Sequence, residues 1–287
     1  MGNPFIPFPR CENIIIVGDA AAEYLGALRI YGRGLIGGDV PSMELLHPME
    51  KHLECVSCFL NDPTQVLMPA VRRMKANFVV LEENGSADFN PAAGREALEK
   101  EGISVKILDV RGSTESVLRR AGKLFGEEKQ AERIIRERTK RLAALDDVRK
   151  SIRKGQKAAI FLAIRSPVRH ESYVFRISER SALSQLLTNT FAIENINVRP
   201  NAEERIPGIQ ELDDLSDLFE KNPDLIVYTG DAAACGQKIA EFIRKHPQFA
   251  ECNAVNNGRI YGAPYYCHAL DLRRHEILEA WSDVLAD

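Results

Sequence analysis

The chain has 287 residues, of which 45% are hydrophobic and 28% charged, and its formal net charge is −3 at pH 7. This composition is typical of a soluble globular protein and excludes a disordered or fibrous one. The small negative charge gives no general electrostatic reason to bind nucleic acid or an acidic membrane surface, so no nucleic-acid partner is expected.

The first 126 residues alternate between apolar runs, which are typical of buried strands, and segments with helical periodicity. Such alternation predicts a parallel sheet with right-handed crossovers. The expected strands cover residues 13–18, 34–39, 77–83 and 103–110, and the expected helices cover 20–32, 64–75, 90–102 and 113–126.

A single long helix is predicted over residues 127–155. The stretch contains no Pro, and its only Gly is the last residue, Gly155. Strong helix formers fill most of it, and its apolar residues are spaced for one stripe. A helix of this length would span about 40 Å, roughly the width of a domain. Its interleaved charges indicate a solvated face and not a nucleic-acid site.

After this helix the alternation starts again, with expected strands at 157–164, 192–198, 223–230 and 258–264 and expected helices at 181–188, 210–222, 233–246 and 270–287. One large sheet interrupted by a surface helix would fit this pattern. Two self-contained series on either side of one helix favour two lobes instead. The predicted fold is therefore α/β, with two parallel-sheet, Rossmann-like lobes (1–125 and 156–287) joined by a backbone helix (126–155).

Four stretches carry a resemblance to a known family. They are "MPAVRRMKANFVVLEENG", "SVLRRAGKLFGEEKQAERIIRERTKRL", "LSDLFEKNPDLIVYTGDA" and "FAECNAVNNGRIYGAPYY". In order and spacing they resemble segments of the helical-backbone (class III) substrate-binding proteins of ABC importers, which serve ferric siderophores, haem, cobalamin and some metal ions. The resemblance covers residues 12–286.

The resemblance implies a monomeric, non-enzymatic solute-binding component without an intrinsic cofactor. Its ligand would be an iron-siderophore, haem, cobalamin or related metal chelate, captured between the lobes. Family members usually dock on the permease through one exposed acid per lobe. Here those positions fall at Pro69, which is no acid, and near Ser216, where the adjacent Asp217 could substitute.

Ligands of open α/β sheets sit outside the carboxyl ends of the strands, so the loops at those ends hold the candidate ligand residues. Arginine presents a fork that suits anionic groups of a chelate, and His and Tyr could ligate iron. A solvated basic loop and an aromatic cover over the core are the alternatives. The candidates are Arg165, Arg169, His170 and Tyr173 after one strand, and Tyr265, Tyr266 and His268 before the last helix.

Two thiols lie three positions apart, at Cys55 and Cys58, after two imidazoles at His47 and His52. These are ligand types that zinc or another thiophilic metal takes, although the order is not that of a zinc finger. Incidental cysteines are the alternative. An intracellular two-lobed α/β enzyme or metal-handling protein that uses these cysteines is the alternative function.

Three further stretches give weaker evidence about the function and location of the protein. The turns "GDAAAEYLG" and "TGDAAACG" could present backbone amides to an anion, but neither has the G-x-G-x-x-G pattern. The start "MGNPFIPFPRCEN" lacks the pattern of a signal peptide. Because a Met-Gly start also remains when a signal is replaced, a periplasmic or extracytoplasmic location is expected and a cytoplasmic one stays open.

Overall fold

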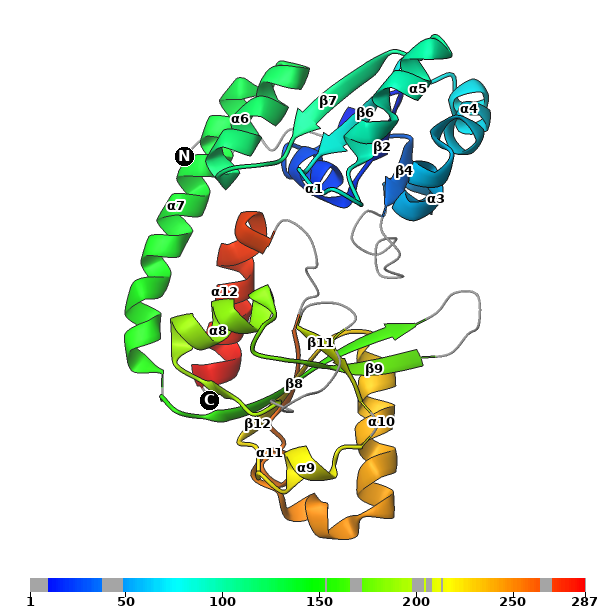
Figure 1. Cartoon of the computed structure of the whole chain (residues 1–287). Coiled ribbons are helices and arrows are strands. Elements are labelled where there is room, and N and C mark those ends of the chain that lie inside the picture. Colours follow the sequence, from blue (N-terminus) through cyan, green and yellow to red (C-terminus); the bar gives the residue numbers. More distant parts are fainter. Residues whose placement is uncertain are drawn as a thin grey trace. The chain divides into compact units, whose positions relative to one another are not determined.

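The computed structural model describes residues 10–37, 49–152, 154–165, 172–197, 204, 208–212, 214–263 and 270–286. The chain forms two compact units (Figure 1). Unit 1 comprises residues 1–140 and 267–272, and unit 2 comprises 141–266 and 273–287. Each unit is built around its own sheet, which confirms the predicted two-lobed α/β fold.

Unit 1 contains a sheet of five parallel strands in the order β5-β4-β2-β6-β7. All four residues of the central strand β2 are buried, because its neighbours cover both edges and helices cover both faces. The strands are β2 Ile14–Val17, β4 Gly34–Gly37, β5 Lys51–Cys55, β6 Phe78–Glu83 and β7 Val105–Asp109, and a separate pair joins β1 Arg10–Cys11 to β3 Ile30–Tyr31.

Successive side chains of β2 enter two different cores, as the twofold period of a strand requires. Ile14 and Ile16 pack with α1 (Asp19–Ala27) and α6 (Thr114–Phe125). Ile15 and Val17 belong to the core on the opposite face. The helices there are α3 Val56–Asn61, α4 Pro63–Met74 and α5 Arg95–Lys100, the last preceded by the 3-10 turn η1 Pro91–Gly94.

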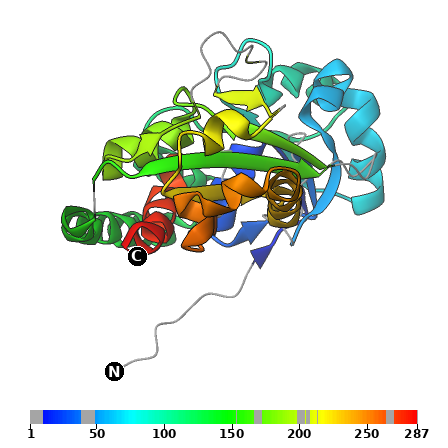
Figure 2. The same ribbon diagram turned by 90° about the horizontal axis from the view of Figure 1, so that it is seen from below.

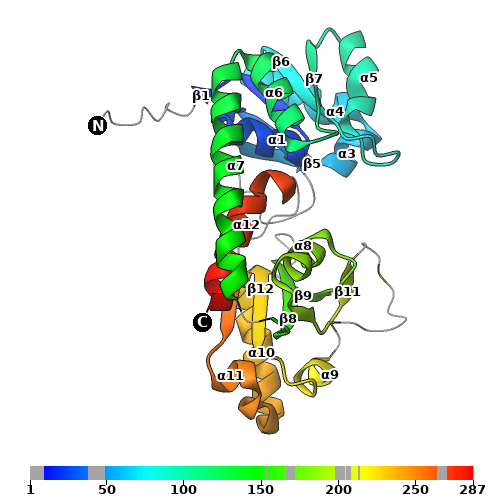
Figure 3. The same ribbon diagram turned by 90° about the vertical axis from the view of Figure 1, so that its left-hand side faces the viewer.

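The predicted long helix is present as α7, which runs without a break over the 24 residues Glu128–Ser151 (Figure 3). It passes from unit 1 into unit 2 at residue 140. Within unit 1 its buried Arg138 donates to Glu115 at 2.8 Å and to Asp271 at 2.9 Å. Within unit 2 its Arg141 donates to Glu279 at 2.8 Å. Both units therefore hold their part of the helix by ion pairs to α12.

Unit 2 contains the sheet β11-β9-β8-β12-β13, with β10 added beside β8. Strands β8, β10, β12 and β13 are parallel, as predicted, whereas β9 and β11 are antiparallel additions that were not predicted. The six residues between β8 and β9 are too few for a parallel crossover, which agrees with the antiparallel pairing of these two strands. The bounds are β8 Lys157–Arg165, β9 Ser172–Ile177, β10 Glu194–Asn195, β11 Ile209–Glu211, β12 Leu225–Gly230 and β13 Ile260–Ala263.

Helices cover both faces of this second sheet (Figure 1, Figure 2). Ala159, Phe161 and Ala163 of β8 pack with the helices of one face. These are α9 Ser216–Phe219, α10 Ala232–Lys245 and α11 Asn253–Asn256, with the 3-10 turn η2 Pro247–Glu251. The other face carries α8 Ala182–Phe191 and α12 Leu270–Ala286. None of the helices in the described ranges is long and apolar enough to cross a membrane.

Candidate functional site

The strand order of unit 1 indicates a candidate binding edge, called the binding edge below. From β2 the chain moves to β4 and β5 on one side and later to β6 and β7 on the other. The order therefore reverses between β2 and β6, and ligands of open α/β sheets bind outside the carboxyl ends of the strands at such a switch point. Because all five strands are parallel, their carboxyl ends at Val17, Gly37, Cys55, Glu83 and Asp109 share one edge.

The carboxylate of Glu82 binds the backbone of the turn from β2 to α1. Glu82 of β6 is 6% exposed, and its Oε2 accepts from the backbone N–H of Ala21, in the first turn of α1, at 2.9 Å. Gly18 has φ of 119°, and a Cβ there would lie 2.4 Å from the Cβ of Glu82. Glycine is therefore required for the carboxylate to reach the helix. The turn "GDAAAEYLG" is not an open anion site.

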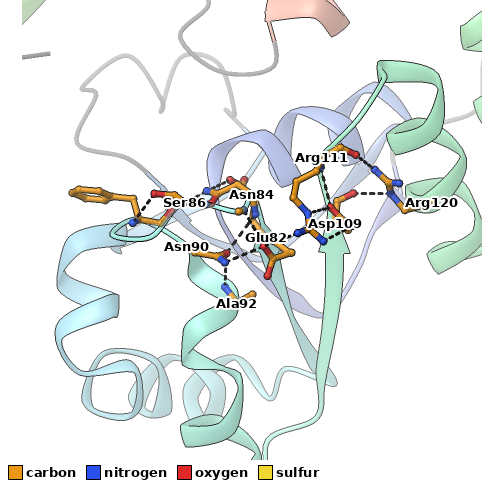
Figure 4. Close-up of polar contacts among 11 residues, drawn as sticks. Glu82, Asn84, Ser86, Asn90, Ala92, Asp109, Arg111 and Arg120 are labelled. Carbon is orange, nitrogen blue, oxygen red and sulfur yellow. Dashed lines mark hydrogen bonds and ion pairs between the residues drawn. The ribbon is translucent and has the colours of Figure 1, made fainter. Parts of the chain in front are cut away.

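The loop after β6 is fixed by a polar network (Figure 4). Asn84 donates from Nδ2 to Oε1 of Glu82 and to the carbonyl of Phe89, both at 2.9 Å. Asn90 donates to Oε1 of Glu83 at 3.0 Å, and Ser86 Oγ accepts from the N–H of Phe89 at 3.0 Å. Phe89 is nevertheless 56% exposed. The loop thus holds an exposed aromatic ring at the binding edge.

An arginine lies at the end of the adjacent strand. Arg111 forms a bidentate pair with Asp109, with Nε–Oδ1 at 2.9 Å and Nη2–Oδ2 at 3.0 Å (Figure 4). These hydrogen bonds lower the pKa of the Asp109 carboxyl to about 2, and they raise the pKa of the guanidinium. Arg120 fixes the same turn by donating to the carbonyls of Asp109, at 2.8 Å, and Arg111. The Arg111 side chain remains 57% exposed.

Phe89 and Arg111 indicate which ligand groups this edge could contact. An exposed ring can stack on a flat conjugated ligand, and a positioned guanidinium can pair with ligand oxygens. Neither residue was predicted from the sequence. Arg111 could have been found, because it follows the expected strand 103–110 at its carboxyl end.

The corresponding edge of unit 2 carries two predicted residues. Arg165 ends β8 opposite Ser172, and Ile164 lies opposite Tyr173, so Arg165 and Tyr173 are close in register across the β8–β9 pair. Tyr173 is 40% exposed. Both remain candidate ligand residues.

The second glycine turn also satisfies its own helix. Asp231 accepts from the N–H of Ala234 at 3.0 Å and caps α10. Gly230 has φ of 84°, and a Cβ there would lie 2.2 Å from the carbonyl oxygen of Ala163. Like its counterpart in unit 1, this turn presents a carboxylate and no open anion site.

Five predicted ligand residues lie outside the described residues. They are Arg169, His170, Tyr265, Tyr266 and His268. Their assignment stays a prediction.

The predicted docking acid has an internal partner. Asp217 is at the start of α9, and both its carboxylate oxygens accept from Arg176, at 2.6 Å each. Arg176 is fully buried, whereas the Asp217 side chain is 35% exposed. In unit 1 the matching position, Pro69, lies inside α4. Docking through Asp217 stays a prediction.

The two cysteines predicted as metal ligands lie at the turn from β5 to α3, where Cys55 precedes the helix and Cys58 lies in its first turn. Their ligand atoms group with that of Glu54. His52 is not part of this group, and His47 lies outside the described residues.

Residues 79–266, more than half of the chain, match the model of a family described as periplasmic binding protein. The chain therefore belongs to the periplasmic binding protein family and is a solute-binding component of an ABC-type importer, as predicted. The family is made up of substrate-binding proteins, not enzymes, and its members are periplasmic or extracytoplasmic. No curated protein matches the chain.

Solved structures confirm the fold over nearly the whole chain. The periplasmic heme-binding protein RhuT from Roseiflexus sp. RS-1 is similar with a TM-score of 0.63 at 14% identity, covering 96% of this chain and 98% of that one. The iron-uptake system-binding protein FeuA from Bacillus subtilis gives 0.61 at 19% identity, covering 95% and 94%. A periplasmic heme binding protein from Pseudomonas aeruginosa gives 0.61 at 14%, covering 97% and 92%.

Proposed function

We propose that this chain captures an iron-siderophore, haem, cobalamin or related metal chelate at the carboxyl edges of its two sheets and delivers it to a permease. The observation that carries the proposal is that exposed Phe89 follows β6 and half-exposed Arg111 follows β7, both at the carboxyl edge of the sheet of unit 1. Chelates of this class combine flat conjugated rings with anionic oxygens, which is what a ring and a guanidinium recognise. RhuT, a periplasmic heme-binding protein, and FeuA, an iron-uptake system-binding protein, support the same class.

The proposal includes no catalysis by this chain, no intrinsic cofactor, a monomeric state and an extracytoplasmic location. Unit 2 would contribute Arg165 and Tyr173 from its own edge, with Arg169, His170, Tyr265, Tyr266 and His268 as further candidates. Membership of a family of substrate-binding proteins supports this function over the alternative of an intracellular enzyme.

Replacing Arg111 with alanine is expected to weaken chelate binding by about ten- to 150-fold, because a hydrogen bond from a charged donor to a ligand oxygen is lost. Phe89→Ala should weaken it by about three- to tenfold through lost stacking. Haem, a ferric catecholate siderophore and cobalamin would each be titrated into the purified protein, with affinity read from ligand absorbance and calorimetry.

Two matched variants control for exposure and charge. Arg119 is 54% exposed and paired with Glu132 at 2.6 Å, and Met49 is 52% exposed just before the amino end of β5. Arg119→Ala and Met49→Ala should leave affinity unchanged. Equal affinity in all four variants would remove unit 1's edge from the site, and failure of all three ligands to bind would reject the chelate class.

Docking on the permease is expected to be weak and only weakly dependent on salt. The carboxylate of Asp217 is already paired with Arg176, and unit 1 has Pro69 where an acid is usual. Exposed charges at an interface act mainly on the association rate and its salt dependence. Association with the cognate permease in lipid nanodiscs would be timed across a salt series. Fast docking that collapses as salt is added would show that other acids perform this role.

A further inference from the structure

A cluster of three metal-ligating side chains lies at the turn from β5 to α3. The Glu54 carboxylate and the thiols of Cys55 and Cys58 place one ligand atom each within 4.8 Å of one another. Cys55 is opposite Gly37 of β4, so the cluster lies at the carboxyl end of the edge strand of unit 1. Phe89 and Arg111 follow β6 and β7, so none of the three donors is among the residues proposed above to bind the chelate.

The turn holds these donors by backbone contacts. Cys55 has the extended backbone of an N-cap, and its Sγ accepts from the N–H of Cys58 at 3.1 Å. This bond holds the Cys55 sulfur over the first helical turn, where the Cys58 sulfur lies within 4.8 Å of it. Glu54 Oε1 accepts from the N–H of Cys55 at 3.2 Å, which keeps the carboxylate over the same turn.

The core anchors the helix that carries the second thiol. Val56 and Phe59 of α3 are buried, Phe59 completely. Gly94 of η1 packs so closely on the Phe59 ring that a Cβ there would lie 2.6 Å from its Cζ. The cluster thus lies on a fixed turn, while Glu54 is exposed and the two cysteines are half-buried.

The spacing of the donors fits one tetrahedral ion. Sulfur ligands at about 2.3 Å from zinc lie roughly 3.8 Å from each other, and carboxylate oxygens bind at about 2.0–2.2 Å. The three ligand atoms lie within 4.8 Å of one another, so each pair is at most about 1 Å further apart than in a bound tetrahedral site. Rotation of the side chains can supply a change of this size. Two thiolates and a carboxylate also select thiophilic divalent ions over calcium or magnesium, which prefer oxygen.

We propose that Glu54, Cys55 and Cys58 bind a thiophilic divalent cation of the zinc class, with the fourth position open to water or an external donor. This goes beyond the proposed function, because the site needs no chelate and lies entirely in unit 1. The Cys-x-x-Cys spacing predicted the two thiols. The third donor is Glu54 and not His52, whose Nε2 is directed to the neighbourhood of Gly37 and Asp19.

Cobalt(II) serves as the probe, because a tetrahedral thiolate site gives it intense visible bands and a sulfur-to-cobalt charge-transfer band. Titration of the full chain under a phosphine reductant should give these bands at one equivalent, and zinc should abolish them by displacement. Cys55→Ser and Cys58→Ser should each weaken binding by about 100-fold or more, since loss of even an outer-shell partner costs about 10–100-fold. Glu54→Gln should weaken binding by about tenfold.

Two controls make the test specific. Ser57→Ala changes the same turn but keeps all three donors, so it should bind cobalt like the wild type. The double variant Cys55→Ser/Cys58→Ser measures binding by the other four cysteines of the chain. Persistence of the charge-transfer band in that double variant would overturn the proposal, as would its absence from the wild type. If the double variant fails to fold, equal affinity of Glu54→Gln and Ser57→Ala would overturn it instead.

Discussion

Replacing Asp217 with alanine is expected to destabilise unit 2 by about 3–5 kcal/mol, because it leaves a buried guanidinium without its counter-charge. The Arg176 side chain has no exposed surface, and two of its nitrogens donate to the two oxygens of Asp217 at 2.6 Å each. Among the described residues, Arg176 also donates to the carbonyl of Asp214, at 2.5 Å. A neutral acceptor cannot compensate a charge in this position, so the cost approaches that of breaking a buried pair.

The single tryptophan of the chain makes the experiment specific to unit 2. Trp281 lies in α12 and is 2% exposed, so its fluorescence reports the loss of that unit's core in a denaturant titration. Asp147→Ala is the matched control, because Asp147 pairs with Lys150 at 2.8 Å while both side chains are largely exposed. Exposed pairs of this kind contribute little, so the control should unfold at the wild-type midpoint. An equally small effect of Asp217→Ala would show that water reaches Arg176.

This ion pair shows why part of the fold could not be predicted. The strand β9 has the sequence SYVFRI, in which Arg176 takes a position that alternation marks as polar. Burial of this position depends on β11 pairing alongside, with Gln210 opposite Arg176, and on α9 supplying the acid. Both come from distant parts of the chain. By contrast, β2, β6, β7, β8 and β12 were predicted because each is a nearly continuous apolar run, which needs no knowledge of its neighbours.

The loops of the binding edge could likewise be predicted from the sequence, whereas the exposed side chains in them could not. The rule that ligands lie at the carboxyl ends of parallel strands leads from the sequence to the loops at this edge, including the one after β6. It does not say which side chains of a loop are exposed. From the sequence, Phe89 would be expected to be buried, because it is hydrophobic. In the structure, hydrogen bonds of Asn84, Ser86 and Asn90 hold the loop in a conformation that exposes the Phe89 ring. The edge strand β5 was missed because its sequence, KHLEC, contains no continuous apolar run.

The buried carboxyl of Glu50 is expected to make the free energy of unfolding fall as pH rises. Glu50 is 8% exposed, and its Oε1 accepts from the N–H of Gly32 at 2.6 Å. Burial raises its pKa from 4.5 to about 7, although the hydrogen bond from Gly32 opposes the shift. Because the folded state holds the proton more tightly, this group's contribution is fully present below pH 4.5. It is lost between there and about pH 7.

A shift of this size corresponds to about 3 kcal/mol between the two ends of that range. Glu50→Gln keeps an acceptor for Gly32 but cannot ionise, so the variant should be more stable than the wild type by about 2–3 kcal/mol above pH 7. Near pH 4.5 the two should be equal, because both side chains are then neutral in the folded state. Denaturant titrations followed by circular dichroism at several pH values measure the difference, and Glu99→Gln, an exposed pair with Arg95, is the control. A difference between wild type and Glu50→Gln that does not change with pH would mean that the carboxyl ionises alike in the folded and unfolded chains.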